Sequence, residues 1–170
     1  MAKIKKNFVE LIGKTPLLAA IRFGQKEGLD ANIFAKLEYF NPGGSVKDRI
    51  AAAIIQAAAQ SGQLKPGGTI IESSSGNTAI GLAIASAIKG YHFIAVVDHH
   101  ASKEKIDMIK AYGAEIVVVG DGYKANEVAV IEREKTAKRM SEEMENAFFP
   151  NQAYNFNNRA AYIDTLADEL

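Results

Sequence analysis

The chain has 170 residues, and its 20 basic and 20 acidic side chains give a formal net charge of zero. A balanced charge provides no general attraction to nucleic acid or to an anionic membrane. The absence of cysteine excludes disulfides, thiolate metal ligands and a cysteine nucleophile. Hydrophobic residues make up 48% of the sequence, but no apolar run reaches the roughly 20 residues that span a bilayer, so we expect a soluble, cytoplasmic globular protein.

Short β-rich runs alternate with longer helical segments along the chain. The expected strands cover 33–37, 69–73, 93–97 and 115–119. Their apolar residues are contiguous rather than alternating, which is typical of parallel strands covered on both faces. Because strand–helix repetition favours right-handed βαβ units, the sequence predicts an α/β fold with an open, twisted parallel sheet and helices on both faces.

The first two expected helices follow the first two of these strands. One covers 50–60, and Ser45 with Asp48 ahead of it resembles a capping box. The other covers 77–89 and is closed by Gly90, since a glycine commonly ends a helix in the left-handed conformation.

Two further helices are expected at 103–112 and 127–145. Ser102 is the expected cap of the first of them. The terminal segments 1–32 and 146–170 have no clear partner element, apart from a short helical tail at the end of the chain. The side chains expected to be buried from the 127–145 helix are Val128, Ile131 and Met140.

The segment 41–49, Asn-Pro-Gly-Gly-Ser-Val-Lys-Asp-Arg, is the first candidate for chemistry. Its glycines allow a sharp turn and Ser45 opens the helix, which places Lys47 in the first helical turn. Amide dipoles at a helix N-terminus disfavour a protonated amine, and this suits a lysine that reacts as a nucleophile. A solvated lysine beside Asp48 is the plainer interpretation, and spacing alone favours it.

The second candidate is the loop 73–78, Ser-Ser-Ser-Gly-Asn-Thr, between an expected strand and an expected helix. Hydroxyls, a glycine and an amide converge there on a helix N-terminus, where free N–H groups attract a carboxylate or a phosphate. Open α/β sheets bind ligands at this end of their strands, although an ordinary N-cap would also have such residues.

A metal site is not predicted. His99 and His100 follow Asp98 at the end of the third strand, but no spacing typical of a zinc site includes them. We interpret 98–100 as a polar loop at the rim of the cleft. The chain also has neither a G-x-G-x-x-G nor a Walker pattern.

Together the two loops resemble those of the fold-type II pyridoxal-phosphate (PLP) enzymes, and most closely the cysteine synthase (O-acetylserine sulfhydrylase) branch. The likeness extends over essentially the whole chain. It implies a tryptophan synthase β-like fold, a PLP cofactor, an amino-acid substrate and a homodimer. The segments that support it, besides 41–49, are 13–17, 36–38, 74–78, 81–83 and 151–152.

The resemblance also implies a reaction and a role for each matching residue. The reaction is β-replacement on an activated serine. Lys47 would form a Schiff base with PLP and act as general acid and base, and Asn77 would hydrogen-bond the ring hydroxyl. The residues implied to hold the α-carboxylate of the substrate are Ser74, Ser75, Gly76, Thr78 and Gln152.

The sequence departs from the cysteine synthase pattern in two ways. Gly43-Gly44 and Val96-Val97-Asp98 resemble a branch that uses phosphoserine, so O-acetylserine and phosphoserine are both open as substrates. Family members also continue beyond this point, and their glycine-rich phosphate loop lies in that portion. A truncated, non-catalytic domain that binds an amino acid, a carboxylate or another protein is therefore the alternative.

The resemblance divides the chain into two parts. Residues 36–145 correspond to the smaller α/β domain of the family, which carries Lys47 and the serine loop. Residues 1–35 and 146–170 correspond to segments of the larger, cofactor-binding domain. We expect these terminal segments to expose apolar surface.

Overall fold

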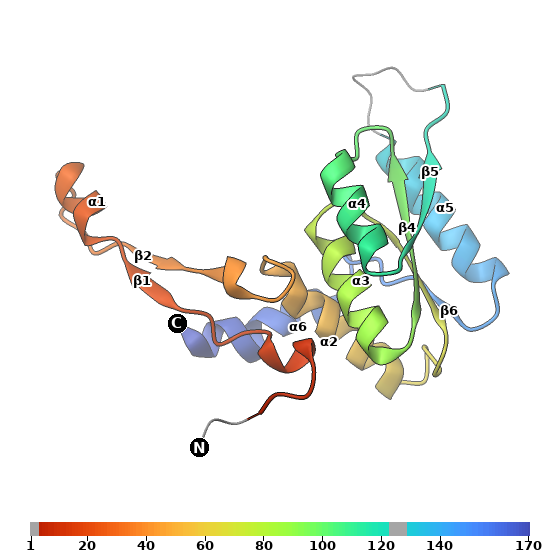
Figure 1. The fold of residues 1–170 in the computed structure, drawn as a ribbon, viewed down its shortest axis with the longest axis horizontal. Coiled ribbons are helices and arrows are strands. Elements are labelled where there is room, and N and C mark those ends of the chain that lie inside the picture. Colours follow the sequence, from red (N-terminus) through yellow and green to blue (C-terminus); the bar gives the residue numbers. More distant parts are fainter. Residues whose placement is uncertain (1–3, 123–128) are drawn as a thin grey trace.

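The protein is described by a computed structural model that covers residues 4–122 and 129–170. Its main sheet has four parallel strands in the order β5-β4-β3-β6 (Figure 1). The α/β fold with an open parallel sheet is confirmed. The strands are β3 (Thr69–Ser73), β4 (His92–Asp98), β5 (Glu115–Val119) and β6 (Ala147–Phe148).

Helices cover both faces of this sheet (Figure 1). On one face lie α2 (Lys47–Gln60), α3 (Asn77–Lys89) and α4 (Lys103–Ala111). On the other lies α5 (Val130–Glu143), while α6 (Phe156–Ala161) packs against α2. The short helical turns are η1 (Phe8–Leu11), η2 (Glu38–Phe40), η3 (Tyr162–Leu166, a π turn) and η4 (Ala167–Glu169).

The contiguous apolar strands explain the two-sided burial. Alternate residues of a strand point to opposite faces, so Ile70 packs toward α2 and α3 and its neighbour Ile71 packs toward α5. The same division separates Phe93, Ala95 and Val97 from Ile94 and Val96 on β4.

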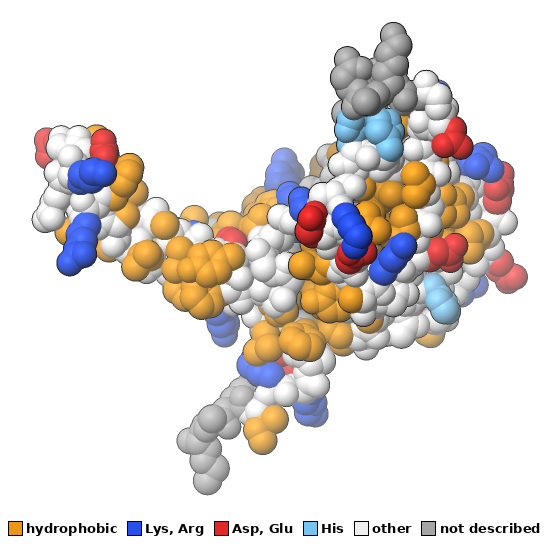
Figure 2. Space-filling view, turned by 45° about the horizontal axis from the view of Figure 1, so that its top comes forward, with side chains coloured by type: hydrophobic (Ala, Val, Ile, Leu, Met, Phe, Trp, Pro, Cys, Tyr) orange, Lys and Arg blue, Asp and Glu red, His pale blue; other side chains and the backbone are white. Residues whose placement is uncertain are grey.

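The segment 17–36, here called the arm, stands away from the sheet (Figures 1 and 2). It consists of β1 (Leu17–Ala19), α1 (Ile21–Lys26) and β2 (Phe34–Lys36), and β1 pairs with β2 in an antiparallel sheet of two strands. The prediction that 33–37 joins the parallel sheet is therefore wrong, and β6 occupies the position beside β3. Apolar side chains exposed on the arm are Leu17, Leu18, Ile21, Phe23, Leu29 and Phe34.

The helix at 77–89 and its cap are confirmed, because α3 ends at Gly90 with φ of 74°. Ser102 caps α4 as expected, by accepting a hydrogen bond from the Lys105 N–H at 3.4 Å. The capping box at Ser45 and Asp48 is wrong: α2 begins at Lys47, and the Asp48 carboxylate accepts from Gly43 instead.

The helix expected at 127–145 is shorter in the structure, where α5 starts at Val130. Met140 packs against the sheet as expected. Ile131 is 67% exposed, so its expected burial is wrong: it lies on the solvent side of a helix that buries Ala137. Val128 lies outside the described residues.

Candidate functional site

The loop 41–49 turns sharply so that α2 can begin at Lys47. Gly44 has φ of 78°, a left-handed conformation that favours glycine. A Cβ at Gly43 would overlap the Asp48 carboxylate, whose Oδ2 accepts from the Gly43 N–H at 2.5 Å. Burial raises the pKa of Asp48 above its ordinary value. The two glycines and Asp48 therefore fix the position of Lys47 at the start of the helix.

The Lys47 side chain is half-buried, and its amine is not neutralised by an acid. Its Nζ donates to the Tyr162 hydroxyl at 3.4 Å. Within 4–122 and 129–170, no carboxylate lies at ion-pair distance from this amine. Tyr162 belongs to η3, so a residue 115 positions later in the sequence contacts the predicted reactive lysine.

The start of α2 lies directly against α3. A Cβ at Gly81 would lie 3.2 Å from the Lys47 carbonyl oxygen and 3.2 Å from the Ala51 Cβ. The absent side chain at Gly81 therefore permits the two helices to approach closely. Because Gly81 lies one turn beyond Asn77, the structure brings the first turn of α2 beside the early turns of the helix that starts in the serine loop.

The serine loop connects the end of β3 to the start of α3. Ser74 Oγ accepts from the Gly76 N–H at 3.3 Å, which leaves the Ser74 hydroxyl hydrogen available for another acceptor. Gly76 is the N-cap residue of α3, and no side chain caps this helix. A Cβ at Gly76 would meet only the Lys105 amine, at 4.0 Å, so the loop is open on that side and faces a positive charge.

The remaining predicted residues lie in and beside this loop. Ser74, Ser75 and Gly76 are half-buried, Asn77 is exposed, and Thr78 is buried in the first turn of α3. Gln152 is held at the same end of β3, because its N–H donates to Glu72 Oε2 at 3.1 Å.

Glu72 is the residue at this site that the sequence analysis missed. It precedes the serine loop, and its Oε1 accepts from the Ser73 N–H at 2.9 Å. Burial raises the pKa of Glu72 to about 7, against the opposing effect of its two N–H donors. A signal was present in the sequence, since Glu72 is an acidic residue directly after Ile70 and Ile71 in an expected buried strand.

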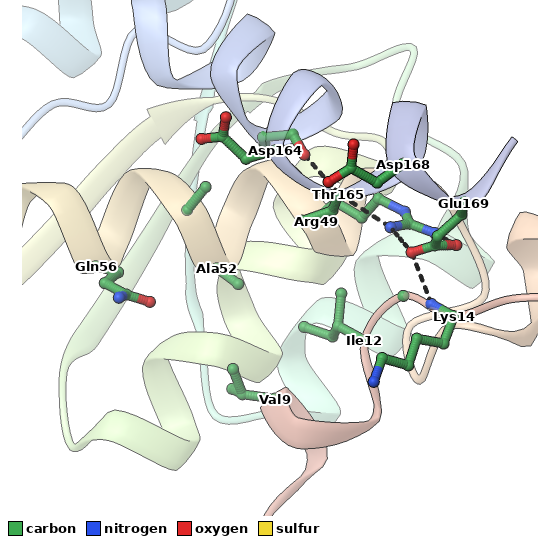
Figure 3. A pocket seen from close by; sticks show the side chains of 13 residues that line it. Val9, Ile12, Lys14, Arg49, Ala52, Gln56, Asp164, Thr165, Asp168 and Glu169 are labelled. Carbon is green, nitrogen blue, oxygen red and sulfur yellow. Dashed lines mark hydrogen bonds and ion pairs between the residues drawn. The ribbon is translucent and has the colours of Figure 1, made fainter.

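Arg49 is the second residue that the sequence analysis did not assign. Its side chain is 1% exposed and forms an ion pair with Glu38 at 2.8 Å. A second ion pair joins it to Glu169 at 2.7 Å (Figure 3). Lys36 donates to Glu169 at 2.6 Å, and Thr15 donates to Glu38 at 2.6 Å. This group, here called the Arg49 cluster, lowers the pKa of Glu38 and Glu169 and attaches both terminal segments to α2.

A cavity of about 530 Å³ lies beside the Arg49 cluster rather than at the serine loop (Figure 3). Its lining includes Ile12, Ala52 and Thr165, and it contains none of the predicted site residues. Among the described residues, no group of three or more acidic or histidine side chains is placed to hold a metal ion. No helix in the described ranges is long and apolar enough to span a membrane.

Comparison with known proteins shows the family of this chain. Residues 9–170 match the family described as pyridoxal-phosphate dependent enzymes. A putative cysteine synthase of Sinorhizobium fredii is 47% identical over 95% of this chain and 46% of its own length. A probable cysteine synthase of Bacillus subtilis is 43% identical over 100% of this chain and 52% of its own length.

A more distant relative and a solved structure extend the comparison. The cystathionine beta-synthase of Oryctolagus cuniculus is 41% identical over 99% of this chain and 30% of its own length. The crystal structure of O-ureido-L-serine synthase superposes with a TM-score of 0.87 at 33% identity, over 98% of this chain and 50% of that one. The chain thus spans about half the length of the cysteine synthases that it matches.

Proposed function

The chain belongs to the pyridoxal-phosphate dependent enzyme family, and we propose that its reaction is β-replacement on an activated serine. The chain would carry out this reaction itself or as the amino-terminal part of a longer protein. The activated serine would be of the O-acetylserine or phosphoserine type. The observation that supports this most directly is the close approach of α2 and α3 at Gly81, because it sets Lys47 beside the helix that begins in the serine loop.

The residues present are compatible with PLP at this position. The half-buried Lys47 amine meets a neutral hydroxyl, so it is not committed to a carboxylate. The N-terminus of α3 lacks a side-chain cap, so its first N–H groups can donate hydrogen bonds to an anionic group. The open side of Gly76 leaves space for a ligand next to these donors.

Each residue then has a defined task in the proposed reaction. PLP, when bound, supplies an electron sink that weakens the bond between the substrate's α-carbon and its hydrogen. The Lys47 Nζ would attach the cofactor and afterwards hold or return that proton. Asn77 would hydrogen-bond the ring hydroxyl of the cofactor. The donors for the substrate carboxylate would be Ser74, Ser75, Gly76, Thr78 and Gln152.

Reductive trapping tests the assignment of Lys47. The protein is incubated with PLP, reduced with borohydride, digested and analysed by mass spectrometry. We expect a visible absorbance band before reduction and a cofactor adduct on the peptide that contains Lys47. Lys47→Ala should lose both signals, whereas Lys110→Ala, which removes an exposed lysine of α4, should keep both. Equal labelling of surface lysines in wild type and Lys47→Ala would contradict the assignment.

A second candidate function is binding without turnover. It is supported by the uncapped N-terminus of α3, whose N–H groups can bind a carboxylate without a cofactor. Such a domain would bind an amino acid or a carboxylate at the serine loop, or another protein, without catalysis. Steady turnover of O-acetylserine or phosphoserine with sulfide by the 170-residue chain would eliminate this candidate, and carboxylate binding without turnover would support it.

A further inference from the structure

Glu72 occupies an unusual position for an acidic residue. It lies on β3 directly after Ile70 and Ile71, and it is 2% exposed. Taking a carboxylate out of water costs several kcal/mol unless hydrogen bonds compensate. Within the described ranges, no lysine or arginine lies at ion-pair distance from it. An apolar residue would fill this position without that desolvation cost, which suggests that the carboxylate has a specific role.

The hydrogen bonds of Glu72 join two segments that are 80 residues apart. One carboxylate oxygen accepts from the Ser73 N–H at 2.9 Å, where the serine loop begins. The other accepts from the Gln152 N–H at 3.1 Å. These two backbone donors partly offset the effect of burial and of Glu134 on the pKa of Glu72, which is raised to about 7.

Gln152 is held from its other side as well. The Asn158 amide donates to the Gln152 carbonyl oxygen at 2.7 Å, so both backbone groups of Gln152 have partners. The preceding residue, Asn151, has φ of 45°, a left-handed conformation that asparagine adopts more readily than most residues other than glycine. The backbone therefore changes direction at the residue that leads into Gln152.

We propose that Glu72 is a positioning residue that holds Gln152 against the serine loop, so that both segments bind the same substrate carboxylate. This inference rests on the proposed function in one respect, namely that Ser74–Thr78 and Gln152 are taken as the carboxylate-binding elements. Glu72 itself does not touch the substrate. It acts through the Ser73 and Gln152 N–H groups, each of which requires an acceptor oxygen.

Glu72→Gln separates this role from a general contribution to stability. The variant has nearly the same shape, but its amide can present only one oxygen acceptor to the two N–H donors. Glu72→Asp keeps the charge on a shorter side chain and serves if Glu72→Gln does not fold. Asp98→Asn is the control for the loss of a buried acid. Asp98 is also buried at a strand end and accepts from the His100 and Ala129 N–H groups, and it differs from Glu72 in its ion pair with Arg133 at 3.5 Å.

The experiment follows the backbone amides of Thr78 and Gln152 by NMR while L-serine is added to the ¹⁵N-labelled 170-residue protein without PLP. In the wild type and in Asp98→Asn we expect both amides to respond with one shared Kd. In Glu72→Gln or Glu72→Asp the Gln152 response should disappear, and the Kd at Thr78 should rise about tenfold through the loss of one oriented donor segment.

Either of two results would overturn the proposal. One is an unchanged Kd with both amides still responding together in the Glu72 variants; the other is a wild type in which Gln152 does not respond to L-serine. Because this experiment uses no cofactor, it is independent of the trapping experiment on Lys47. A Lys47 adduct without coupling of Thr78 and Gln152 would reject the role of Glu72 and leave the cofactor assignment intact.

Discussion

Glu72 and Glu169 are both glutamates that join distant parts of the chain, but their environments shift the carboxyl pKa in opposite directions. Glu72 accepts from two neutral N–H groups in a buried position, and its pKa rises to about 7. Glu169 accepts from Arg49 and Lys36, and its pKa falls below its ordinary value. Burial explains the rise at Glu72, and the cationic partners explain the fall at Glu169.

The two glutamate carboxylates therefore contribute differently to the free energy of unfolding. The Arg49 cluster is compensated by charge and attaches the terminal segments to α2. The Glu72 carboxylate is under-compensated and lies at the predicted binding site. Buried acids with perturbed pKa values are enriched at functional sites, in agreement with this contrast.

Arg49→Met should have the largest effect on stability. It removes the buried cation and leaves Glu38 and Glu169 without their main partner, so we expect the free energy of unfolding to fall by about 3–5 kcal/mol. Chemical denaturation measures this loss. Arg139→Met removes an exposed ion pair to Glu143 at 3.2 Å and should change stability by less than about 0.5 kcal/mol. Equal losses in both variants would contradict the role of Arg49 in attaching the terminal segments to α2.

The pH dependence of stability should differ in sign between the two glutamates. The raised pKa of Glu72 means that the folded state holds an extra proton between pH 4.5 and 7, so its contribution to stability falls as pH rises through this window. The change is on the order of 3 kcal/mol. Glu169 contributes stability above pH 4.5 and loses it as pH falls below that value.

Unfolding measured from pH 3 to 8 in single variants separates these contributions. Glu72→Gln should flatten the curve between pH 4.5 and 7, and Glu169→Gln should flatten it only below pH 4.5. If Glu72→Gln leaves the slope between pH 4.5 and 7 unchanged, burial does not raise the pKa of Glu72.

Gly81→Ala tests the connection between α2, which carries Arg49 and Lys47, and α3. The new Cβ would lie 3.2 Å from the Lys47 carbonyl oxygen, so the helices must separate slightly, and we expect a loss of about 1–3 kcal/mol. The borohydride-trapped adduct on Lys47 should also decrease. Gly24→Ala is the control, because its Cβ would make only an ordinary contact with the Ala31 carbonyl oxygen at 3.7 Å. In this variant the adduct on Lys47 should not decrease.

Tyr162→Phe should have the smallest effect. It removes a single hydroxyl that accepts from the Lys47 amine at 3.4 Å, and we expect a change in stability of less than about 1 kcal/mol. Denaturation and the absorbance of added PLP measure the two consequences. An unchanged absorbance band is expected, and its complete loss would show that the terminal segment takes part directly in holding the cofactor.

Much of the fold was predictable because local signals agreed with tertiary packing. The contiguous apolar runs at β3 and β5 predicted both strands with their observed bounds, and Gly90 marked the end of α3. β6 escaped detection because a strand of two residues shows no periodicity. Pairing of 34–36 with 17–19 rather than with the main sheet depends on contacts that periodicity does not encode.

The parts of the candidate site that lie in short, continuous sequence segments were predictable. The loops around Lys47 and Ser74 have recognisable residues at a strand–helix junction, and the resemblance assigned Gln152. Three other contacts join residues that are far apart in the sequence. Glu72 and Gln152 are 80 positions apart, Lys47 and Tyr162 are 115 apart, and Arg49 and Glu169 are 120 apart. Such pairings become visible only when the chain is folded.

The arm has one consequence for how the protein opens to solvent. Its two strands pair only with each other, and their apolar side chains lie outside the core, so little packing energy resists their separation. Its amide protons should therefore be replaced by deuterium orders of magnitude faster than those of β4, which is paired on both sides and buried on both faces.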